Sequence, residues 1–526
     1  MTSPPAPSPR TPWAEIAIAA LPAALHAVVL LGRLHPDELF QSLEVALHRA
    51  YGFGIVPWEW QVPPNAAATQ PWGIRNHAVP MLLAALFKAG DLVGISSVMG
   101  RRLLAELPQF LLHVAMLGAV WRLAARRVSA PLARACVWLV ALYGPLVWFG
   151  GRTMSESFST AFLVWGLERL DAEELAPGWW AWGGALLGLA QVTRYGSAAV
   201  IVPALLWLLV ARRFRAFAFA AAGGLVVALG LGLLDKLTWG DWFHSLIHYV
   251  RFNLVSGQAA AQFGAQPWWT YLGRLLLPPF ALVGLFFAVR RDRWLKPAAA
   301  VLGVAAIAAA VATFVPVLAP TAPWLGLLAA GALGFLLLER GTPRPSLLLA
   351  AALGYVTILS ATAHKEDRFL YPALILLTVA GAPGFATWAG EAWTRGTARR
   401  AAVVLLASLG LLFFVFPSPF DVQRKEQFQL AARASRGATG LVIMNEGMWG
   451  SPGYFYLGQN VPWCPCDFPQ DGCFQFATRD ARFNRGLYWS NGSEAEKPRD
   501  AQARAAFEAA GFRFVESRGQ ASLFER

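Results

Sequence analysis

Long apolar runs recur along most of this chain, and they constrain its fold more than any other feature of the sequence. A helix needs about 20 mostly apolar residues to cross the hydrocarbon core of a bilayer. Runs of roughly this length lie near residues 13–31, 102–121, 130–149, 155–170, 178–193, 198–211, 216–234, 271–289, 297–316, 323–338, 346–362, 370–388 and 401–417. The chain is 56% hydrophobic and only 14% charged, outside the usual range of soluble proteins. The pattern predicts an α-helical polytopic membrane protein with about 13 transmembrane helices.

The run at 79–95 decides how these spans are oriented. It contains Lys88 and Asp91, and we interpret it as peripheral or re-entrant instead of spanning. All the strong basic clusters then fall in the cytoplasm, as the positive-inside rule requires. These clusters are "RLAARR" (122–127), "RRFR" (212–215), "RRDR" (290–293), "ERGTPR" (339–344) and "RGTARR" (395–400). The amino terminus is predicted inside and the carboxyl terminus outside, and the net charge of +13 reflects cytoplasmic loops and not nucleic-acid binding.

The same orientation collects the unusual polar segments on the outer face. They are "HPDELFQ" (35–41), "GRTMSES" (151–157), "TRYGS" (193–197), "DKLTWGDWF" (235–243) and "HKEDRF" (364–369). Charged side chains facing lipid without partners cost about 2.5–3.5 kcal/mol each at the bilayer centre. The segments are therefore predicted to line a shared aqueous cavity.

The chain is predicted to have three parts. Residues 1–12 form a disordered cytoplasmic segment, residues 13–417 a transmembrane catalytic domain with a long outer loop at 32–101, and residues 418–526 a small extracytoplasmic α/β domain. In this last part "GLVIMNEG" and "FRFVESR" have the pattern of strands, and "SPGYFYLGQ" that of a short helix or turn. "AQARAAFEAAGF" is predicted to be a helix that stops at Gly511.

Three of the four cysteines crowd into the carboxyl-terminal part. If this part faces an oxidising compartment, Cys473 can pair with Cys464 or with Cys466. A zinc site is the weaker interpretation, because "CPCDFPQDGC" lacks a second pair of ligands.

The acids of the first outer loop are candidates for proton transfer. Asp37 and Glu38 are adjacent, so on a helix they point about 100° apart and cannot both face one substrate atom. One can act as a base while the other binds a cation, an arginine or a hydroxyl. Partial desolvation at a membrane boundary is expected to raise the carboxyl pKa and to favour proton acceptance. The simpler alternative is that these acids only solvate a loop.

Cationic residues on the same predicted face suit a phosphate, because arginine can hold two oxygens and lysine supplies a point charge. The candidates are His364, Lys365, Arg368, Arg152 and Arg194. The alternative is a positive loop that pairs with its own acids.

Three stretches resemble, in order and approximate spacing, the motifs of glycosyltransferase family 22. They are "HPDELFQSLEVALHRAYGFGIVPWEW" (35–60), "DKLTWGDWFHSLIHYVRFNLVSGQAAAQFGAQPWWTYL" (235–272) and "HKEDRFLYP" (364–372), and the resemblance covers most of residues 13–417. That family comprises lipid-phosphate-mannose-dependent α-mannosyltransferases. The resemblance implies a GT-C fold, a catalytic acid in the first outer loop, a polyprenyl-phosphate sugar donor and transfer with inversion.

On the basis of this resemblance Asp37 is expected to be the general base, with Glu38 as its neighbour in the motif, and the cations are expected to stabilise the leaving lipid phosphate. A second set of residues is expected to bind the acceptor or to order the loop. It consists of His35, Gln41, Glu44, Glu59, Trp60, Arg75 and Glu366. No metal ligands are assigned; a divalent cation is compatible with the mechanism but is not required.

The expected partners are a polyprenyl-phosphate-linked sugar, a glycan or lipid-linked oligosaccharide acceptor, and the bilayer. The outer "CPCDFPQDGC" element departs from better-known members, and the Pro- and Ala-rich character suggests a bacterial source. A site facing the periplasm from the inner membrane is then expected, equivalent to the ER lumen in eukaryotic relatives. Two alternatives remain: a GT-C transferase that moves another lipid-phosphate sugar to protein or lipid A, and a flippase or transporter of lipid-linked glycans.

Overall fold

The computed structural model describes residues 10–61, 72–173, 175–271, 280–284, 347–411, 425–445, 448–467, 469–490 and 492–526. Its larger part is helical. The helices of this part are α1 (Trp13–Val29), α2 (Glu44–Tyr51), α3 (Ala78–Leu92), α4 (Val98–Ala125), α5 (Ala130–Ala141), α6 (Gly144–Phe149), α7 (Ser155–Asp171), α8 (Pro177–Thr193), α9 (Ala198–Val210), α10 (Phe214–Trp239), α11 (His244–Val250), α12 (Gln258–Phe263), α16 (Leu347–Ala361), α17 (Tyr371–Thr394) and α18 (Thr397–Leu411).

The predicted apolar spans form helices wherever the structure describes them, and three are long and apolar enough to cross a membrane by length and composition. These are Val98–Ala125, Phe214–Trp239 and Asp367–Thr394. Shorter apolar helices include α1, α5 and α16. The runs predicted near 271–289, 297–316 and 323–338 lie largely or wholly outside the described residues. A membrane protein is supported, but the described residues do not establish a count of 13 spans.

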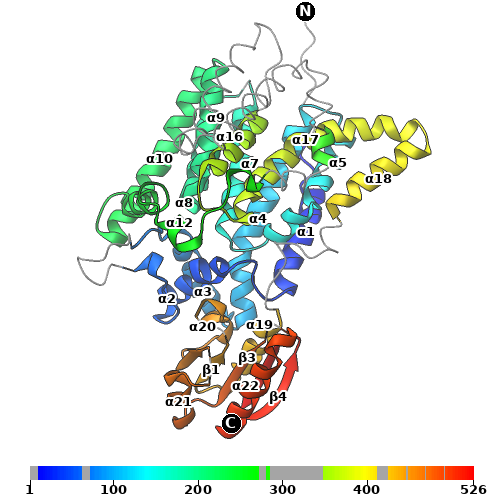
Figure 1. Ribbon diagram of the computed structural model, residues 1–526. Coiled ribbons are helices and arrows are strands. Elements are labelled where there is room, and N and C mark those ends of the chain that lie inside the picture. The colour runs from blue at the N-terminus through cyan, green and yellow to red at the C-terminus, as the bar shows by residue number, and fades with distance from the viewer. Residues whose placement is uncertain are drawn as a thin grey trace, which may run out of the picture.

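The run at 79–95 forms α3, which is only 15 residues long. Helix α16, which was predicted to span, has the same length, so the peripheral placement of α3 stays a prediction. Figure 1 shows α2 and α3 at the end of the helical part that faces the carboxyl-terminal domain.

Small residues allow close helix packing in the helical part. A Cβ atom on Gly184 of α8 would lie 1.8 Å from the carbonyl oxygen of Ala220 in α10, and one on Gly223 of α10 would lie 1.9 Å from that of Ala181. Neither glycine can therefore be replaced without separating the two backbones. Such approaches are characteristic of helix pairs in membranes, where van der Waals packing drives association.

The carboxyl-terminal part is a small α/β domain at one end of the molecule (Figure 1). Its elements are α19 (Lys425–Ala434), β1 (Leu441–Met444), α20 (Gly453–Leu457), β2 (Trp463–Cys466), α21 (Gly472–Arg479), β3 (Arg485–Trp489), α22 (Lys497–Ala509), β4 (Arg513–Arg518) and β5 (Ala521–Glu525). The sheet order is β2-β1-β3-β5-β4. β1 runs parallel to β2 and β3, whereas β5 runs antiparallel to β3 and β4.

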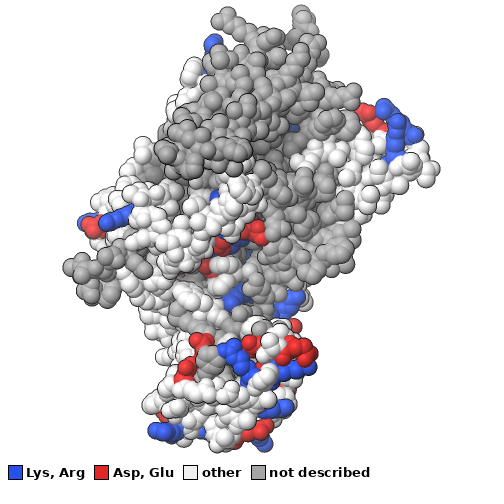
Figure 2. All heavy atoms as spheres, in the orientation of Figure 1, with Lys and Arg blue, Asp and Glu red and all other residues white. Residues whose placement is uncertain are grey.

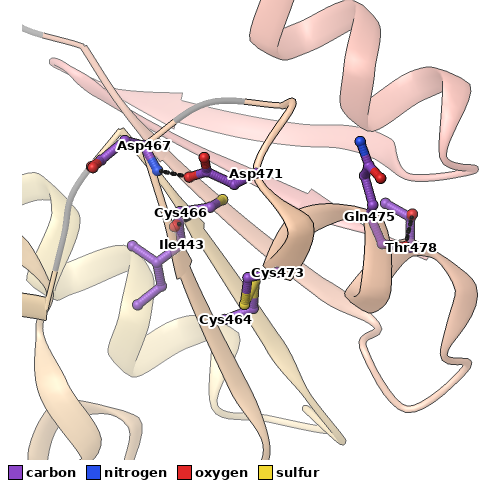
Figure 3. Close-up of a disulfide and its surroundings, with 8 residues drawn as sticks. All are labelled: Ile443, Cys464, Cys466, Asp467, Asp471, Cys473, Gln475 and Thr478. Atoms are coloured by element: carbon purple, nitrogen blue, oxygen red, sulfur yellow. Dashed lines mark hydrogen bonds between the residues drawn. A yellow bond between two sulfur atoms is a disulfide. The ribbon is translucent and has the colours of Figure 1, made fainter.

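The sequence correctly predicted β1, β4, α20 and α22, and Gly511 follows the end of α22 with a φ of 84°. Strands β2, β3 and β5 were not predicted. Cys464 and Cys473 form a disulfide between β2 and α21 (Figure 3), one of the two pairings that the sequence left open, and Cys466 is free and buried.

Candidate active site

A group of charged side chains lies where four distant segments meet. The segments are the loop that begins at Gly32, the start of α7, the end of α8 with Arg194, and the turn before α17 that contains the 3-10 helix η8 (Asp367–Leu370). Figure 2 shows a small group of red and blue atoms within the mostly white and grey surface of the helical part. The predicted convergence of the outer polar segments is therefore present for "HPDELFQ", "GRTMSES", "TRYGS" and "HKEDRF".

Asp37 lies at the centre of this group. It precedes a π-helix, η1 (Glu38–Leu43), as its N-cap residue. Its Oδ2 is 2.6 Å from Nη1 of Arg368, and its Oδ1 is 3.2 Å from Nδ1 of His35. Burial alone would raise the pKa of Asp37, but the Arg368 guanidinium and His35 hold that pKa well below its usual range. The expected rise in pKa is therefore wrong for this arrangement, because the sequence could not show the cation beside the acid.

Arg368 joins three carboxylates. Besides Asp37 it contacts Glu366, with 2.6 Å between Nε and Oε2, and Glu156, with 3.5 Å between Nη1 and Oε1. Its side chain is only 11% exposed. A guanidinium that is held on several sides in this way is fixed in position before any ligand arrives.

Glu156, in the first turn of α7, was missed as a site residue. It is fully buried, and its Oε1 accepts from Nη1 of Arg194 at 2.7 Å as well as facing Arg368. The sequence analysis noted its segment, "GRTMSES", but took Arg152 from it. An acid inside an apolar run, four residues from an arginine, was the signal that could have revealed Glu156.

The other residues of "HKEDRF" surround Glu366. His364 Nε2 lies 3.0 Å from Oε1 of Glu366, and His35 Nε2 lies 3.4 Å from Oε2. Burial would raise the pKa of Glu366, but the hydrogen bond from His364 and the charge of Arg368 lower it below its ordinary value. The carboxylate is thus ionised and orders both histidines and the arginine.

Arg152 and Lys365 do not join the anion site that the sequence predicted. Arg152 is fully buried; it pairs with Glu38 at 3.2 Å and donates to the carbonyl oxygens of Gly32 and Leu30. Its guanidinium is therefore directed at Glu38 and the backbone, and its assignment to the donor phosphate stays a prediction. Both adjacent acids thus pair with an arginine, Glu38 with Arg152 and Asp37 with Arg368.

The Lys365 ammonium is turned toward backbone carbonyls. It donates to Gln266 at 3.1 Å and to Thr362, and the residue is only 2% exposed. A lysine held in this way anchors the loop, and its assignment to the donor phosphate also stays a prediction. His364, Arg368 and Arg194 remain as candidate cations.

A second ionic group adjoins Asp37. Glu59 pairs with Arg75 at 3.0 Å and accepts from Nε2 of Gln41 at 3.0 and 3.2 Å. Burial raises the pKa of Glu59, and the charge of Asp37 raises it further against the opposing effect of Arg75. The predicted residues Gln41, Glu59 and Arg75 therefore contact one another, and their loop-ordering role stays a prediction.

Trp60 and Glu44 are structural in this arrangement. Trp60 is 7% exposed, and its ring lies 4.9 Å from that of His77. Glu44 is fully buried and accepts backbone N–H groups, which agrees with a loop-ordering role. Within the described ranges no three His, Cys, Asp or Glu side chains are grouped so that they could hold a metal ion.

The fold is similar to that of a protein of known structure along the whole chain. ArnT from Cupriavidus metallidurans, solved with undecaprenyl phosphate bound, matches over 98% of both chains with a TM-score of 0.54 and 13% sequence identity. The apo form of that protein matches with the same TM-score. The fold is therefore of the GT-C type.

The chain belongs to the Alg9-like mannosyltransferase family, which matches residues 13–420. Mannosyltransferase APTG1 of Arabidopsis thaliana is 26% identical over 50% of this chain and 48% of its own length. GPI mannosyltransferase 3 of Yarrowia lipolytica is 24% identical over 66% and 57%, and GPI alpha-1,2-mannosyltransferase 3 of Homo sapiens is 24% identical over 49% and 46%. The chain thus spans about half the length of the curated relatives it matches.

Proposed function

We propose that this chain is an integral-membrane mannosyltransferase that moves mannose, with inversion, from a polyprenyl-phosphate donor to a glycan or lipid-linked acceptor. The observation that carries the proposal is the contact between Asp37 and Arg368, which sets a carboxylate against a guanidinium within a family of mannosyltransferases. The donor class is supported by the undecaprenyl phosphate bound to the similar fold of ArnT.

In the proposed reaction an acceptor hydroxyl attacks the anomeric carbon of the donor. The new C–O bond forms as the bond between that carbon and the lipid phosphate oxygen breaks, and the bonding electrons leave with the phosphate. The Asp37 carboxylate takes the hydroxyl proton. Arg368 and Arg194, held together through Glu156, stabilise the phosphate that departs.

The ion pair at the site gives this mechanism an ordered first step. While Arg368 faces Asp37, the carboxylate is a weak base because its pKa is held low. A donor phosphate that binds the same guanidinium brings a negative charge beside Asp37 and offsets part of the charge of Arg368, so the pKa of Asp37 rises toward its ordinary value. Donor binding thereby activates the base.

The site is proposed to face the extracytoplasmic side. The basic clusters that set this orientation include "RLAARR" (122–127), at the end of α4 that lies away from the carboxyl-terminal domain. The disulfide between Cys464 and Cys473, drawn in Figure 3, supports an oxidising compartment for the carboxyl-terminal domain. A bacterial inner membrane with a periplasmic site is the proposed location.

The test uses the full chain in lipid nanodiscs with a short-chain polyprenyl phosphate β-mannose and total membrane lipids as the acceptor pool. Transfer of mannose by the wild type, with release of polyprenyl phosphate, is the expected result. The same assay with glucose or aminoarabinose donors tests the rival sugars. Transfer from one of these and not from mannose would overturn the donor assignment.

A deletion strain identifies the acceptor and separates the enzyme from a flippase. Mass spectrometry of its lipid-linked and surface glycans is expected to show one hexose lost, which the intact gene restores and the Asp37→Asn gene does not. Equal restoration by both genes, together with no transfer in nanodiscs, would favour transport of a lipid-linked glycan.

A further inference from the structure

The carboxyl-terminal domain touches the loop that carries Asp37. The contact is made by residues 449–458, which we call the docking segment; it contains α20. Three ring pairs span the contact, with centroids 4.9 Å apart for Phe40 and Trp449, 5.9 Å for Phe87 and Phe455, and 6.0 Å for Phe53 and Tyr454. The buried residues on both sides form one continuous apolar cluster.

A single buried carboxylate lies at the middle of this contact. Oε1 of Glu44 accepts the backbone N–H of Phe455 at 2.7 Å, and Oε2 accepts that of Ile55 at 2.8 Å. Glu44 is fully buried. One side chain therefore ties the docking segment, 411 residues away, to the far side of its own loop.

Gly453 in the docking segment lets the backbone approach the Glu44 carboxyl group closely. It has a φ of +65°, and a Cβ atom there would lie 2.4 Å from Oε1 of Glu44. Both the backbone conformation and the space favour glycine. The close approach of the Glu44 carboxyl group to the backbone of Gly453 indicates a specific, tightly packed contact between the two segments.

Glu44 is connected to Asp37 by one short rigid element. The π-helix η1 begins after Asp37 and ends before Glu44, whose N–H bonds to the carbonyl oxygen of Leu39. On its other side η1 is tied by Ser42, whose hydroxyl donates to the carbonyl oxygen of Thr153 at 2.9 Å. A π-helical turn is rare and persists only where its surroundings hold it.

We propose that the carboxyl-terminal domain is a positioning element of the active site, and that Glu44 is the positioning residue through which it sets Asp37 against Arg368. The inference rests on the proposed function for the role of Asp37. Loss of the Glu44 contact releases one end of η1. The carboxylate of Asp37, at the other end, is then no longer held in its position against Arg368. A displacement of about 1 Å at a reacting group can cost about 100-fold in rate.

The test compares Glu44→Gln and Gly453→Ala with the wild type in the nanodisc assay. A drop in kcat of about 10- to 100-fold with the donor KM changed less than about twofold is expected, because Arg368 and Arg194 lie on other segments and keep their bonds to Glu156. Glu44→Asp, which keeps both acceptor oxygens on a shorter stem, is expected to restore part of the rate.

A stability-matched control is Glu168→Gln. Glu168 is also buried, at 1% exposed, and it pairs with Arg126 at 2.8 Å at the other end of α7. This variant is expected to lower the melting temperature without a matching fall in kcat. If Glu168→Gln loses as much kcat as Glu44→Gln, the effect is general loosening and the positioning role is overturned.

Hydrogen exchange supplies a readout that does not depend on activity. In Glu44→Gln the amides of residues 38–51 are expected to exchange faster while those of α7 stay protected. Unchanged exchange at 38–51 would overturn the inference whatever the activity. Faster exchange with wild-type kcat would leave the docking contact and remove its effect on catalysis. Faster exchange in Glu44→Gln, together with a wild type that transfers no sugar, would overturn the proposed function and leave the docking contact standing.

Discussion

Oδ2 of Asp37 lies 2.6 Å from Nη1 of Arg368, although 331 residues separate the two in the sequence. This pair joins the first polar loop to the turn before α17. It also places the candidate base in direct contact with the arginine that is the candidate binder of the donor phosphate. Each side chain offsets part of the charge of the other.

Asp37→Asn is expected to lower the rate of transfer by about 10²- to 10⁴-fold, which is the usual contribution of a general base. Asparagine keeps the size of the side chain and can still accept from Arg368, but it cannot take a proton. The nanodisc assay with polyprenyl phosphate mannose measures the effect. Asp241→Asn, at an exposed position, is the control. A wild-type rate in Asp37→Asn would assign the base elsewhere.

Glu156→Gln is expected to lower kcat by about 10- to 100-fold and to destabilise the protein by about 3 kcal/mol, because Arg194 and Arg368 lose a shared buried acid. Glu168 lies in the same helix and pairs with Arg126 and Arg122, so Glu168→Gln is a matched control. Thermal unfolding and transfer are measured together. An equal loss of activity in both variants would contradict a specific role for Glu156.

The stability of the folded protein at acidic pH is expected to depend on Glu366. Its pKa is lowered from an ordinary value of 4.5, since His364 and Arg368 outweigh the effect of burial. A carboxyl with a lowered pKa contributes stability that is present above its unfolded pKa and is lost as the pH falls through the folded pKa. The melting-temperature gap between wild type and Glu366→Gln should therefore be constant above about pH 5 and shrink below it. A gap that widens in acid would contradict this.

The docking contact is expected to weaken as the pH rises past neutrality. Burial raises the pKa of Glu44 to about 7, against the backbone N–H groups of Ile55, Phe455 and Tyr454. A carboxyl with a raised pKa contributes stability that is present below its unfolded value and is lost as the pH rises through its folded value. The Tyr454 hydroxyl is kept neutral, because burial and then Glu44 raise its pKa. Arg33 and Arg102 also face the docking segment, where they donate to the carbonyl oxygen of Trp449 and to the hydroxyl of Tyr456. Hydrogen exchange of residues 38–51 should increase from pH 6 to pH 8 in the wild type, beyond the intrinsic change, and not in Glu44→Gln.

Removing the disulfide by Cys473→Ser is expected to destabilise the carboxyl-terminal domain by about 2–4 kcal/mol. Differential scanning calorimetry with and without reductant measures the change. The reductant should lower the transition of the wild type and leave that of the variant unchanged. An unreduced wild type that reacts with thiol probes at Cys464 or Cys473 would show that the bond does not form.

Only part of the site could be predicted from the sequence. Asp37, His35 and Glu366 were named from the resemblance to the family motifs and Arg368 from its suitability for a phosphate, and the structure brings the four side chains together. Arg152 and Lys365 look the same in the sequence, yet one is buried against Glu38 and the other turns into backbone carbonyls. Burial and direction are properties of the packed structure, and no residue pattern distinguishes a ligand-facing cation from a structural one.

The carboxyl-terminal domain shows the same division. β1 and β4 have plain strand patterns, but β2 reads "WCPC", with a proline, and β3 reads "RGLYW", with a glycine. Both residues are unfavourable in strands, and pairing with β1 overrides that local preference.

The sequence by itself determined the helical membrane architecture, the positions of the helices and the polar segments at their ends, because hydropathy acts locally along the chain. Only the tertiary structure decided that Asp37 faces Arg368, that Glu156 joins Arg194 to Arg368, and that Glu44 holds the carboxyl-terminal domain. These are contacts between residues far apart in the chain, and they form only when helix packing brings the segments together.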